Sequence, residues 1–465
     1  MLARMQSAHP LPRPSIRDET GLVRVGATLF FCAALASAWL APALFWMLLP
    51  AALAAGGLVL CFLHATGFCV AWLLIAGATI EMAAGDLIGP AAFQTTIAAV
   101  KASQIGLAAI CAVRFGFRLD TFNPIWAFIV MAGVGMVHGL YPGLSAADSL
   151  RSLIGSIAPF AFCFCRPSLG WAQAIIRATA WCPLVSVGVG IALDLAGVRP
   201  LFVDSGGARL AAVGHPAFLA GVCLVATYAG LIEVYRDNRR RDLILLGVNL
   251  FLLLLTGARA PLMYAVAVVG LSMLLVRSDA VSARGRVLVA LTAGLALPPL
   301  LLLAGELSSV RLFNLLTTDA ANLSGREILW PLFEAAASAS PWFGWGVGAG
   351  NAIVPPDGPV ARLLRTWAAH NEYLRIEVEG GQLGRFLLIA LFILWVRNRT
   401  ATLRHTDRRI LHLAFIALAL HAYTDNVLIS TPACVMFTFV AAVFARGDAE
   451  LADGRSALPG SPPTG

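Results

Sequence analysis

The sequence is poor in charge. Only 12% of its 465 residues are Asp, Glu, Lys or Arg, about half the share of a soluble domain, whereas 59% are hydrophobic. Lysine is almost missing, because Lys101 is the only one and the net charge of +8 comes from arginine. This composition excludes an ordinary soluble protein and predicts a chain that crosses a membrane several times.

Metal-binding patterns are also missing. The nine cysteines lie in or beside apolar runs, without the spacing of a zinc site or a disulfide framework. They are expected to pack as small hydrophobic side chains, so they do not report the redox compartment. The sequence has no Asp-x-Asp metal pair, which fits chemistry without a metal, and no cofactor is expected.

Long apolar runs follow one another with short polar joints. They approach the roughly 20 residues that a helix needs to cross the hydrocarbon, and they favour helices over the alternating strands of a barrel. The predicted fold class is therefore an all-α polytopic membrane protein with about 12–14 transmembrane helices. The expected spans cover residues 22–40, 42–63, 67–85, 92–113, 123–141, 149–165, 171–196, 212–235, 243–256, 260–276, 287–305, 383–397, 410–428 and 431–446.

Arginines between these spans set the expected orientation. With the N-terminus in the cytoplasm, the arginine-rich joints fall on the cytoplasmic side, as the positive-inside rule requires. The N-terminal segment lacks a cleavage signature and is interpreted as a tail rather than a signal peptide. The expected organisation is a cytoplasmic tail over residues 1–20, helices over 21–305, a periplasmic loop over 306–382, helices over 383–446 and a disordered cytoplasmic tail over 447–465.

Several arginines on the expected outer side are not needed for orientation. For Arg311, Arg362 and Arg365, contacts with anionic lipid headgroups or snorkelling are a sufficient explanation. Arg259 is different, because it lies in the tight turn Thr256–Pro261 between two short apolar spans, where an unpaired guanidinium is costly. An anionic partner is expected there, and a ligand is favoured over the alternative of a structural ion pair.

The long outer loop is predicted to end in a helix. Thr366 would cap it, the helix would run to about Glu379, and a Gly-Gly pair would end it. On its surface, Arg375 is placed to pair with Glu372 and with Glu379, which is a structural role.

His370 is the candidate catalytic residue on that helix. It is expected to share one face with Tyr373 and Glu377. His370 and Glu377 would lie two turns apart, roughly 10 Å, so a direct dyad is not assumed. A lone histidine is usually structural, but a neutral imidazole beside the membrane could take a proton from an alcohol near pH 7.

A glycine-rich run, Gly344–Gly350, precedes this helix. Glycines let the backbone approach a ligand or another helix closely. Without a strand or a helix N-terminus beside it, the run is weak evidence for a phosphate site.

These features together resemble a known family. His370-Asn371 followed by Gly381 and Gly384 resembles the signature of the bacterial O-antigen ligases and the related lipid-linked polysaccharide polymerases. The resemblance covers about residues 209–384, and Ala258 departs from it because the family usually has Ser there. Other matching features are the Thr-Gly-Ala-Arg turn at Arg259, Arg326 followed by Trp330, the Gly-Trp-Gly-Val-Gly run, and Arg209 followed by Gly214-His215-Pro216.

The resemblance implies a C-type membrane glycosyltransferase of the bacterial inner membrane, with its active site on the periplasmic side. It would move a glycan from undecaprenyl diphosphate to a sugar hydroxyl, on lipid A-core in a ligase or on a growing polysaccharide in a polymerase. Membrane lipid would be a further partner, and nucleic acid would not. His370 would be the base, and three arginines, Arg209, Arg259 and Arg326, would hold the departing diphosphate. Possible accessory residues are His215, Asn371, Tyr373 and Glu377.

Other interpretations remain open at this point. Glu81 or Asp86, near the outer end of the third span, could be the base, although Lys101 offers a structural partner for either. Structural pairing is also the expectation for Asp148, Arg151 and Asp425. A lipid-glycan transporter would fit a repeated half with broken spans, and we find no internal repeat. The His-Asn spacing favours a ligase over a polymerase.

Overall fold

The computed structural model describes residues 56–204, 207–277, 281–287, 326–355, 358–364 and 366–454, together with Val25, Thr28 and Cys32. The chain divides into two compact units, Met1–Phe68 and Cys69–Gly465, and the contacts below belong to the second. Several predictions lie outside the described residues. These are the tail over 1–20, most of the spans over 22–40, 42–63 and 287–305, Arg311, Arg365 and residues 455–465.

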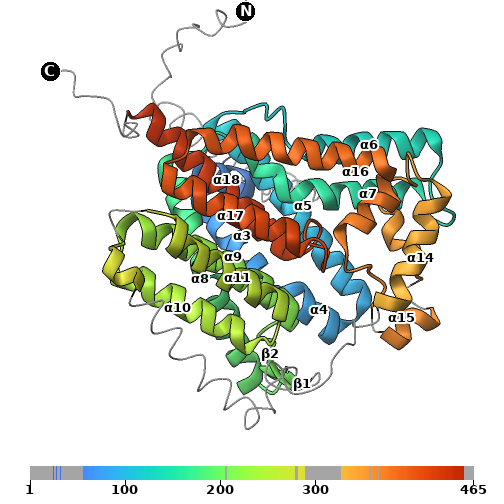
Figure 1. Ribbon diagram of the computed structural model, residues 1–465, viewed down its shortest axis with the longest axis horizontal. Helices are drawn as coiled ribbons and strands as arrows, with labels where there is room; N and C mark the ends of the chain where they lie inside the picture. The colour runs from blue at the N-terminus through green and yellow to red at the C-terminus, as the bar shows by residue number, and fades with distance from the viewer. Residues whose placement is uncertain are drawn as a thin grey trace, which may run out of the picture. The chain divides into compact units, whose positions relative to one another are not determined.

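Helices make up most of the described structure, so the all-α prediction is confirmed (Figure 1). A short antiparallel hairpin, β1 (Phe202–Asp204) and β2 (Ala208–Leu210), is the one sheet among the described residues. The helices are α3 (Ala65–Gly77), α4 (Ile80–Ile88), α5 (Pro90–Phe115), α6 (Ile125–His138), α7 (Ala146–Ile157), η1 (Ala158–Phe164), α8 (Leu169–Leu195), α9 (Pro216–Asp237), α10 (Arg240–Leu255), α11 (Arg259–Leu275), α14 (Arg326–Ala339), η2 (Ala349–Asn351), α15 (Pro359–Leu364), α16 (Glu372–Arg399), η3 (Thr400–Thr402), α17 (His405–His421) and α18 (Thr431–Ala452).

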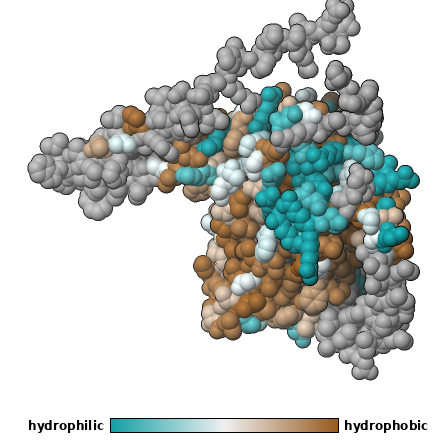
Figure 2. Space-filling view, turned by 90° about the vertical axis from the view of Figure 1, so that its left-hand side faces the viewer, coloured by the Kyte–Doolittle hydropathy of each residue, from teal (hydrophilic) through white to brown (hydrophobic). Residues whose placement is uncertain are grey.

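Four helices in the described part of the chain are both long enough and apolar enough to cross a membrane, with a fifth if the bent pair Gly56–Leu63 and Ala65–Gly77 forms one span. In Figure 2, hydrophobic side chains (brown) cover much of the lower part of the face drawn, and hydrophilic side chains (teal) gather in its upper part. Both observations favour a membrane protein, and the larger helix count stays a prediction. The four helices are Ala92–Phe115, Leu169–Leu195, Pro216–Asp237 and Glu372–Thr402.

Helix α9 is the centre of the second unit. It packs against α8, α10, α11, α17 and α18, and apolar side chains on all of its sides are buried, including Leu219, Val222 and Ala226. A helix that is apolar all round needs such complete cover. Its start and its end therefore lie at fixed places between the ends of its neighbours.

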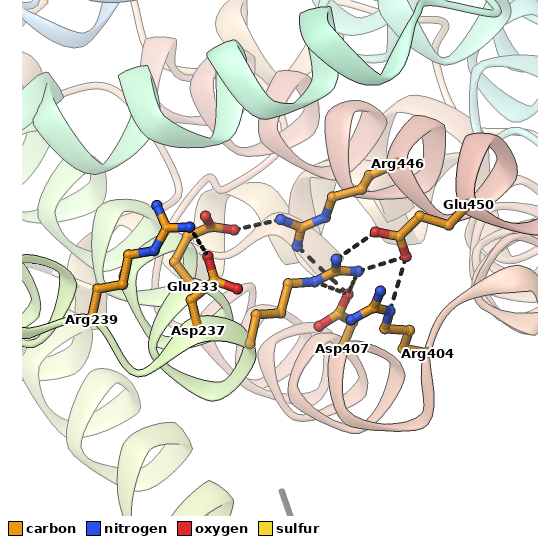
Figure 3. A network of polar contacts seen from close by, with 8 residues as sticks. Glu233, Asp237, Arg239, Arg404, Asp407, Arg446 and Glu450 are labelled. Carbon is orange, nitrogen blue, oxygen red and sulfur yellow. Dashed lines mark hydrogen bonds and ion pairs between the residues drawn. The ribbon is translucent and has the colours of Figure 1, made fainter. Parts of the chain in front are cut away.

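An ion-pair network joins the end of α9 to the start of α17 and the end of α18 (Figure 3). Arg236 donates to Asp407 (2.9 Å) and to Glu450 (2.5 Å), and Arg446 pairs with Glu233. Burial raises the pKa of Glu450, but the charges of Arg236 and its neighbours outweigh this effect and lower that pKa. Arginines that the sequence identifies as orientation signals thus also hold three helices together.

Helix α18 corrects one expected boundary. It continues through Gly447 to Ala452, so its last turns are ordered where a disordered tail from residue 447 is expected. The physical reason is Glu450, which pairs with Arg236 and Arg404 on neighbouring elements. Such pairs tie down a terminus whose composition alone predicts disorder.

Helix α16 is broken at Gly381, where φ is 60° and ψ is −165°. The Gly-Gly pair therefore interrupts the helix, where the sequence predicts its end. The loop after α14 satisfies the backbone groups that the break leaves unpaired. Gln382 N–H donates to Pro341 O (2.8 Å), Leu383 N–H to Trp342 O (3.2 Å), Trp345 N–H to Val378 O (2.9 Å) and Gly346 N–H to Glu379 O (2.9 Å).

The glycines around this break allow close packing. A Cβ on Gly344 would lie 2.5 Å from the backbone nitrogen of Gly380, and a Cβ on Gly384 would lie 2.7 Å from Met131 Sδ on α6. The glycine-rich run is thus a packing element against α16, and at Gly346 the backbone N–H group is already used within the protein.

The substitution Gly381→Ala is expected to lower the apparent Tm in detergent by about 5 °C or more, because its φ/ψ region strongly favours glycine. The added Cβ would also lie 2.3 Å from the Trp342 carbonyl carbon. Gly247→Ala is the matched control, since a Cβ there meets open space in the middle of α10. Equal thermal unfolding of the two variants would contradict the proposed role of the break.

Candidate functional site

One cavity of about 1610 Å³ is lined by the predicted catalytic histidine and by the three predicted diphosphate-binding arginines. It lies where α9 and α11 begin and where α17 passes into α18, and the side walls come from α5 and α7. Segments far apart in the sequence therefore contribute to one space. The predicted residues in its lining are Arg209, His215, Arg259, Arg326 and His370.

The other accessory candidates have structural contacts outside this lining. The Asn371 side chain caps α16 by accepting a hydrogen bond from Leu374 N–H (3.2 Å). Tyr373 donates its hydroxyl to Ala419 O (2.8 Å), and Glu377 pairs with Arg385 (2.5 Å).

His370 precedes α16, which corrects the predicted start of that helix. Asn371 is the cap and Glu372 the first helical residue, so Thr366 caps no helix and His370 does not share a helical face with Tyr373. The backbone of His370 is left-handed, with φ at 48°, a conformation that is uncommon for a residue with a side chain. This backbone turn sets the direction of the imidazole ring.

The His370 ring lies between two oxygen atoms. Its Nδ1 is 3.1 Å from Asp425 Oδ1, and its Nε2 is 3.0 Å from the Thr366 hydroxyl. Burial raises the pKa of Asp425, but the hydrogen bond and charge of His370 outweigh it, so that pKa is lowered and the carboxylate is ionised. An ionised carboxylate only accepts hydrogen bonds. In the neutral ring, Nδ1 therefore carries the proton and Nε2 accepts one from a hydroxyl group.

This arrangement is suited to general-base chemistry on an alcohol. The basic nitrogen already lies at hydrogen-bonding distance from a hydroxyl, here that of Thr366. The side chains of His370 and Asp425 are 36% and 41% exposed, so a solute in the cavity could reach them. A carboxylate that fixes the ring by its other nitrogen is the usual way to orient such a base.

Asp425 is the functional candidate that the sequence interpretation misses. Its expected role is structural pairing, and its partner His370 lies 55 residues away in the chain. Only the packing of the loop between α17 and α18 against the start of α16 brings the two together, as the bond from Glu372 N–H to Ala422 O (2.7 Å) shows.

Arg209 and Arg326 are held by backbone carbonyl groups. Arg209 Nε donates to Thr256 O (2.7 Å), which ties the β-hairpin to the turn before α11. Arg326, the first residue of α14, donates to Thr424 O (2.6 Å). Each of these carbonyl bonds helps to fix the direction of its guanidinium group.

Arg259 begins α11 and is exposed in the cavity lining. Within the described ranges, the ion pairs formed by arginines do not include Arg259. The sequence leaves open a structural ion pair or a ligand at this turn, and the described residues provide no such ion pair. An anionic ligand at this turn stays a prediction.

His215 differs from His370 in its hydrogen bonding. Its Nδ1 accepts from Ala217 N–H (3.2 Å) at the start of α9, so in the neutral ring the proton is on Nε2. Burial, followed by the charges of Arg209 and Arg199, lowers the pKa of His215 and keeps the ring neutral. His215 is therefore placed to donate a hydrogen bond.

The alternative acidic base candidates are outside the cavity lining. Asp86 forms an ion pair with Arg199, and Glu81 is fully buried. Lys101 pairs with neither by a hydrogen bond, and its ammonium donates to Ile429 O (2.9 Å). These positions favour His370 over both acids as the group that faces a substrate.

Three buried charged side chains near the start of α16 form ion pairs with one another. Arg375 pairs with Glu372 and with Glu379 (2.7 Å), as the sequence predicts. The pairs are buried rather than on the surface, with Arg375 4% exposed. They stabilise the first turns of α16, and Arg375 and Glu379 line the same cavity as His370. In the described ranges, no group of three or more His, Cys, Asp or Glu side chains is arranged to hold a metal ion.

Several arginines and a histidine–aspartate pair line one cavity of this helical membrane protein. Such a cavity could bind an anionic group and accept a proton from an alcohol, as a group transfer from an anionic lipid requires. The comparison with protein families agrees, because residues 244–389 match the family described as O-antigen ligase. The recognised resemblance is thus confirmed, and a glycosyltransferase of the ligase or polymerase type is supported. The match includes Arg259, Arg326 and His370. No curated protein matches the chain.

Proposed function

We propose that the protein is a glycosyltransferase of the bacterial inner membrane that transfers a glycan from undecaprenyl diphosphate to a sugar hydroxyl at the periplasmic face. The observation that carries this proposal is the orientation of His370 by Asp425 on the cavity that Arg209, Arg259 and Arg326 also line. Ligation to lipid A-core is the favoured reaction, and polymerisation of the same donor is the alternative.

In the proposed reaction, the acceptor hydroxyl replaces the Thr366 hydroxyl at His370 Nε2. Its oxygen attacks the anomeric carbon while its proton moves to Nε2, and the bond from that carbon to the diphosphate oxygen breaks. The electron pair of this bond leaves with undecaprenyl diphosphate. Arginine side chains offer two parallel N–H donors to the developing charge. One displacement of this kind inverts the anomeric carbon.

The apolar wall of the cavity supports a lipid-linked donor. Phe218, Gly221, Val225 and Tyr228 line it along one face of α9. From His215 to Tyr228 this face extends roughly 20 Å at the helical rise. A cationic opening joined to a long apolar wall suits a molecule with a diphosphate head and a hydrocarbon chain.

Asp425 is expected to act as a positioning residue. Asp425→Asn should lower kcat by about 10²-fold or more, because the amide no longer holds the Nδ1 proton as an ionised carboxylate does. Donor KM should stay within about twofold, since the arginine side chains are unchanged. Asp425→Glu, which restores a carboxylate, should recover part of the rate. A change in donor KM with an unchanged kcat would contradict this role.

The proposed function is tested by gel analysis of glycolipids from a deletion strain. Loss of a ligase should leave bare lipid A-core beside long carrier-linked chains on the periplasmic leaflet. Loss of a polymerase should leave surface chains with a single repeat unit. Carrier-linked glycan confined to the cytoplasmic leaflet would instead identify a transporter and overturn the proposal.

A further inference from the structure

The wall of the cavity formed by α5 and α7 carries two more cations. Lys101 on α5 and Arg151 on α7 both belong to the lining, and the proposed transfer reaction uses neither. The sequence interpretation gives both a structural role. In the structure, both side chains face the cavity instead of forming the expected structural ion pairs with described residues.

The two cations lie along one face of α7. Gly155 is four residues after Arg151, so the two positions are adjacent on the helix surface. A Cβ built on Gly155 would lie 3.1 Å from Lys101 Nζ, which places the ammonium directly over this glycine.

Among the described residues, no carboxylate lies within ion-pair distance of Lys101 or Arg151. Arg151 has only long contacts to Gln94, at 3.4 and 3.5 Å, and the neighbouring Asp148 is engaged by the Ser145 hydroxyl (2.6 Å). Glu81 acts on Lys101 by its charge, but it is buried outside the cavity lining. Two adjacent cations that face a cavity attract an anion.

The loop between α17 and α18 links this pair to the proposed reaction centre. Thr424 O accepts from Arg326, Asp425 holds His370, and Ile429 O accepts from Lys101. Five residues of chain span at most roughly 17 Å, so Lys101 lies within the length of a short oligosaccharide from the arginine side of the cavity.

We propose that Lys101 and Arg151 form a second anion-binding subsite, which holds a phosphate group carried by the acceptor. This inference rests on the proposed function, since it assigns the second substrate of that reaction. Binding the charged group at this wall would place the acceptor hydroxyl near His370 while the diphosphate of the donor occupies the arginine side.

The test measures transfer by the purified protein in phosphatidylcholine vesicles, with lipid A-core as acceptor before and after enzymatic removal of its phosphates. Lys101→Met and Arg151→Gln are each expected to raise the KM for the phosphorylated acceptor by about tenfold or more, because each removes a charge-assisted hydrogen bond. Donor KM and kcat should stay within about twofold. Arg114→Gln, at the other end of α5, is the control.

With the dephosphorylated acceptor, the variants and the wild-type protein should have equal KM values. Equal KM values with the phosphorylated acceptor would overturn the subsite. The subsite would also be overturned if the variants raised the acceptor KM only when phosphatidylglycerol is added, and raised it equally for both acceptors. A lipid headgroup would then fill the site. If Lys101→Met is unstable, Arg151→Gln alone decides, since that side chain is exposed. No transfer by the wild-type protein with any acceptor would count against the proposed function itself.

Discussion

Replacing His370 with alanine is expected to lower the rate of glycan transfer by about 10²- to 10⁴-fold, the usual contribution of a general base. The loss should fall on kcat, because the imidazole acts on the acceptor proton and the arginine side chains still hold the donor diphosphate. The folded protein should persist, since the ring is 36% exposed and its hydrogen bonds within the described residues are to the side chains of Asp425 and Thr366. The measurement is the initial rate of transfer in proteoliposomes, normalised to folded protein.

His405→Ala is the matched control for this variant. His405 is exposed at the opposite end of α17 from the His370–Asp425 pair, so its loss should leave the rate within about twofold, as is usual for surface substitutions. Transfer by His370→Ala at the wild-type rate would remove the base from the mechanism. An equal loss in both variants would point to instability of the helices rather than to catalysis.

The sequence predicts some of the longest helices well because they are long apolar runs. Expected spans over 171–196 and 212–235 coincide closely with α8 and α9, since an apolar run must be helical in lipid. The start of α16 is not predictable in this way. Thr366 and Asn371 are both capping residues by type, and the choice between them depends on tertiary contacts.

The same limit applies to the candidate site. Arg259, Arg326 and His370 are identified from motifs that are local in sequence. The bond between His370 and Asp425 joins two loops that are 55 residues apart, and no helical periodicity relates two loops. The break in α16 at Gly381 could not be predicted from the sequence either. It depends on the loop after α14, whose backbone forms hydrogen bonds with the residues around the break.

Arg259→Ala is expected to lower kcat/KM for the lipid-linked donor by about 10²- to 10³-fold, the effect of removing one strong donor to a developing negative charge. Arg259 is exposed at the start of α11 and belongs to no ion pair within the described residues, so its loss should cost little stability. The kcat/KM of Arg259→Lys should lie between those of the wild-type protein and Arg259→Ala, because lysine keeps the charge but lacks the bidentate fork.

Arg277→Ala separates this effect from a general loss of surface charge. Arg277 is exposed just beyond the other end of α11, so its removal changes the net charge equally without reaching the cavity. Release of undecaprenyl diphosphate in proteoliposomes is the measured quantity. A diphosphate role requires Arg277→Ala to match the wild-type protein while Arg259→Ala loses activity. If the two variants lose activity equally, the charge of α11 acts on orientation in the membrane, and Arg259 has no special place in the reaction.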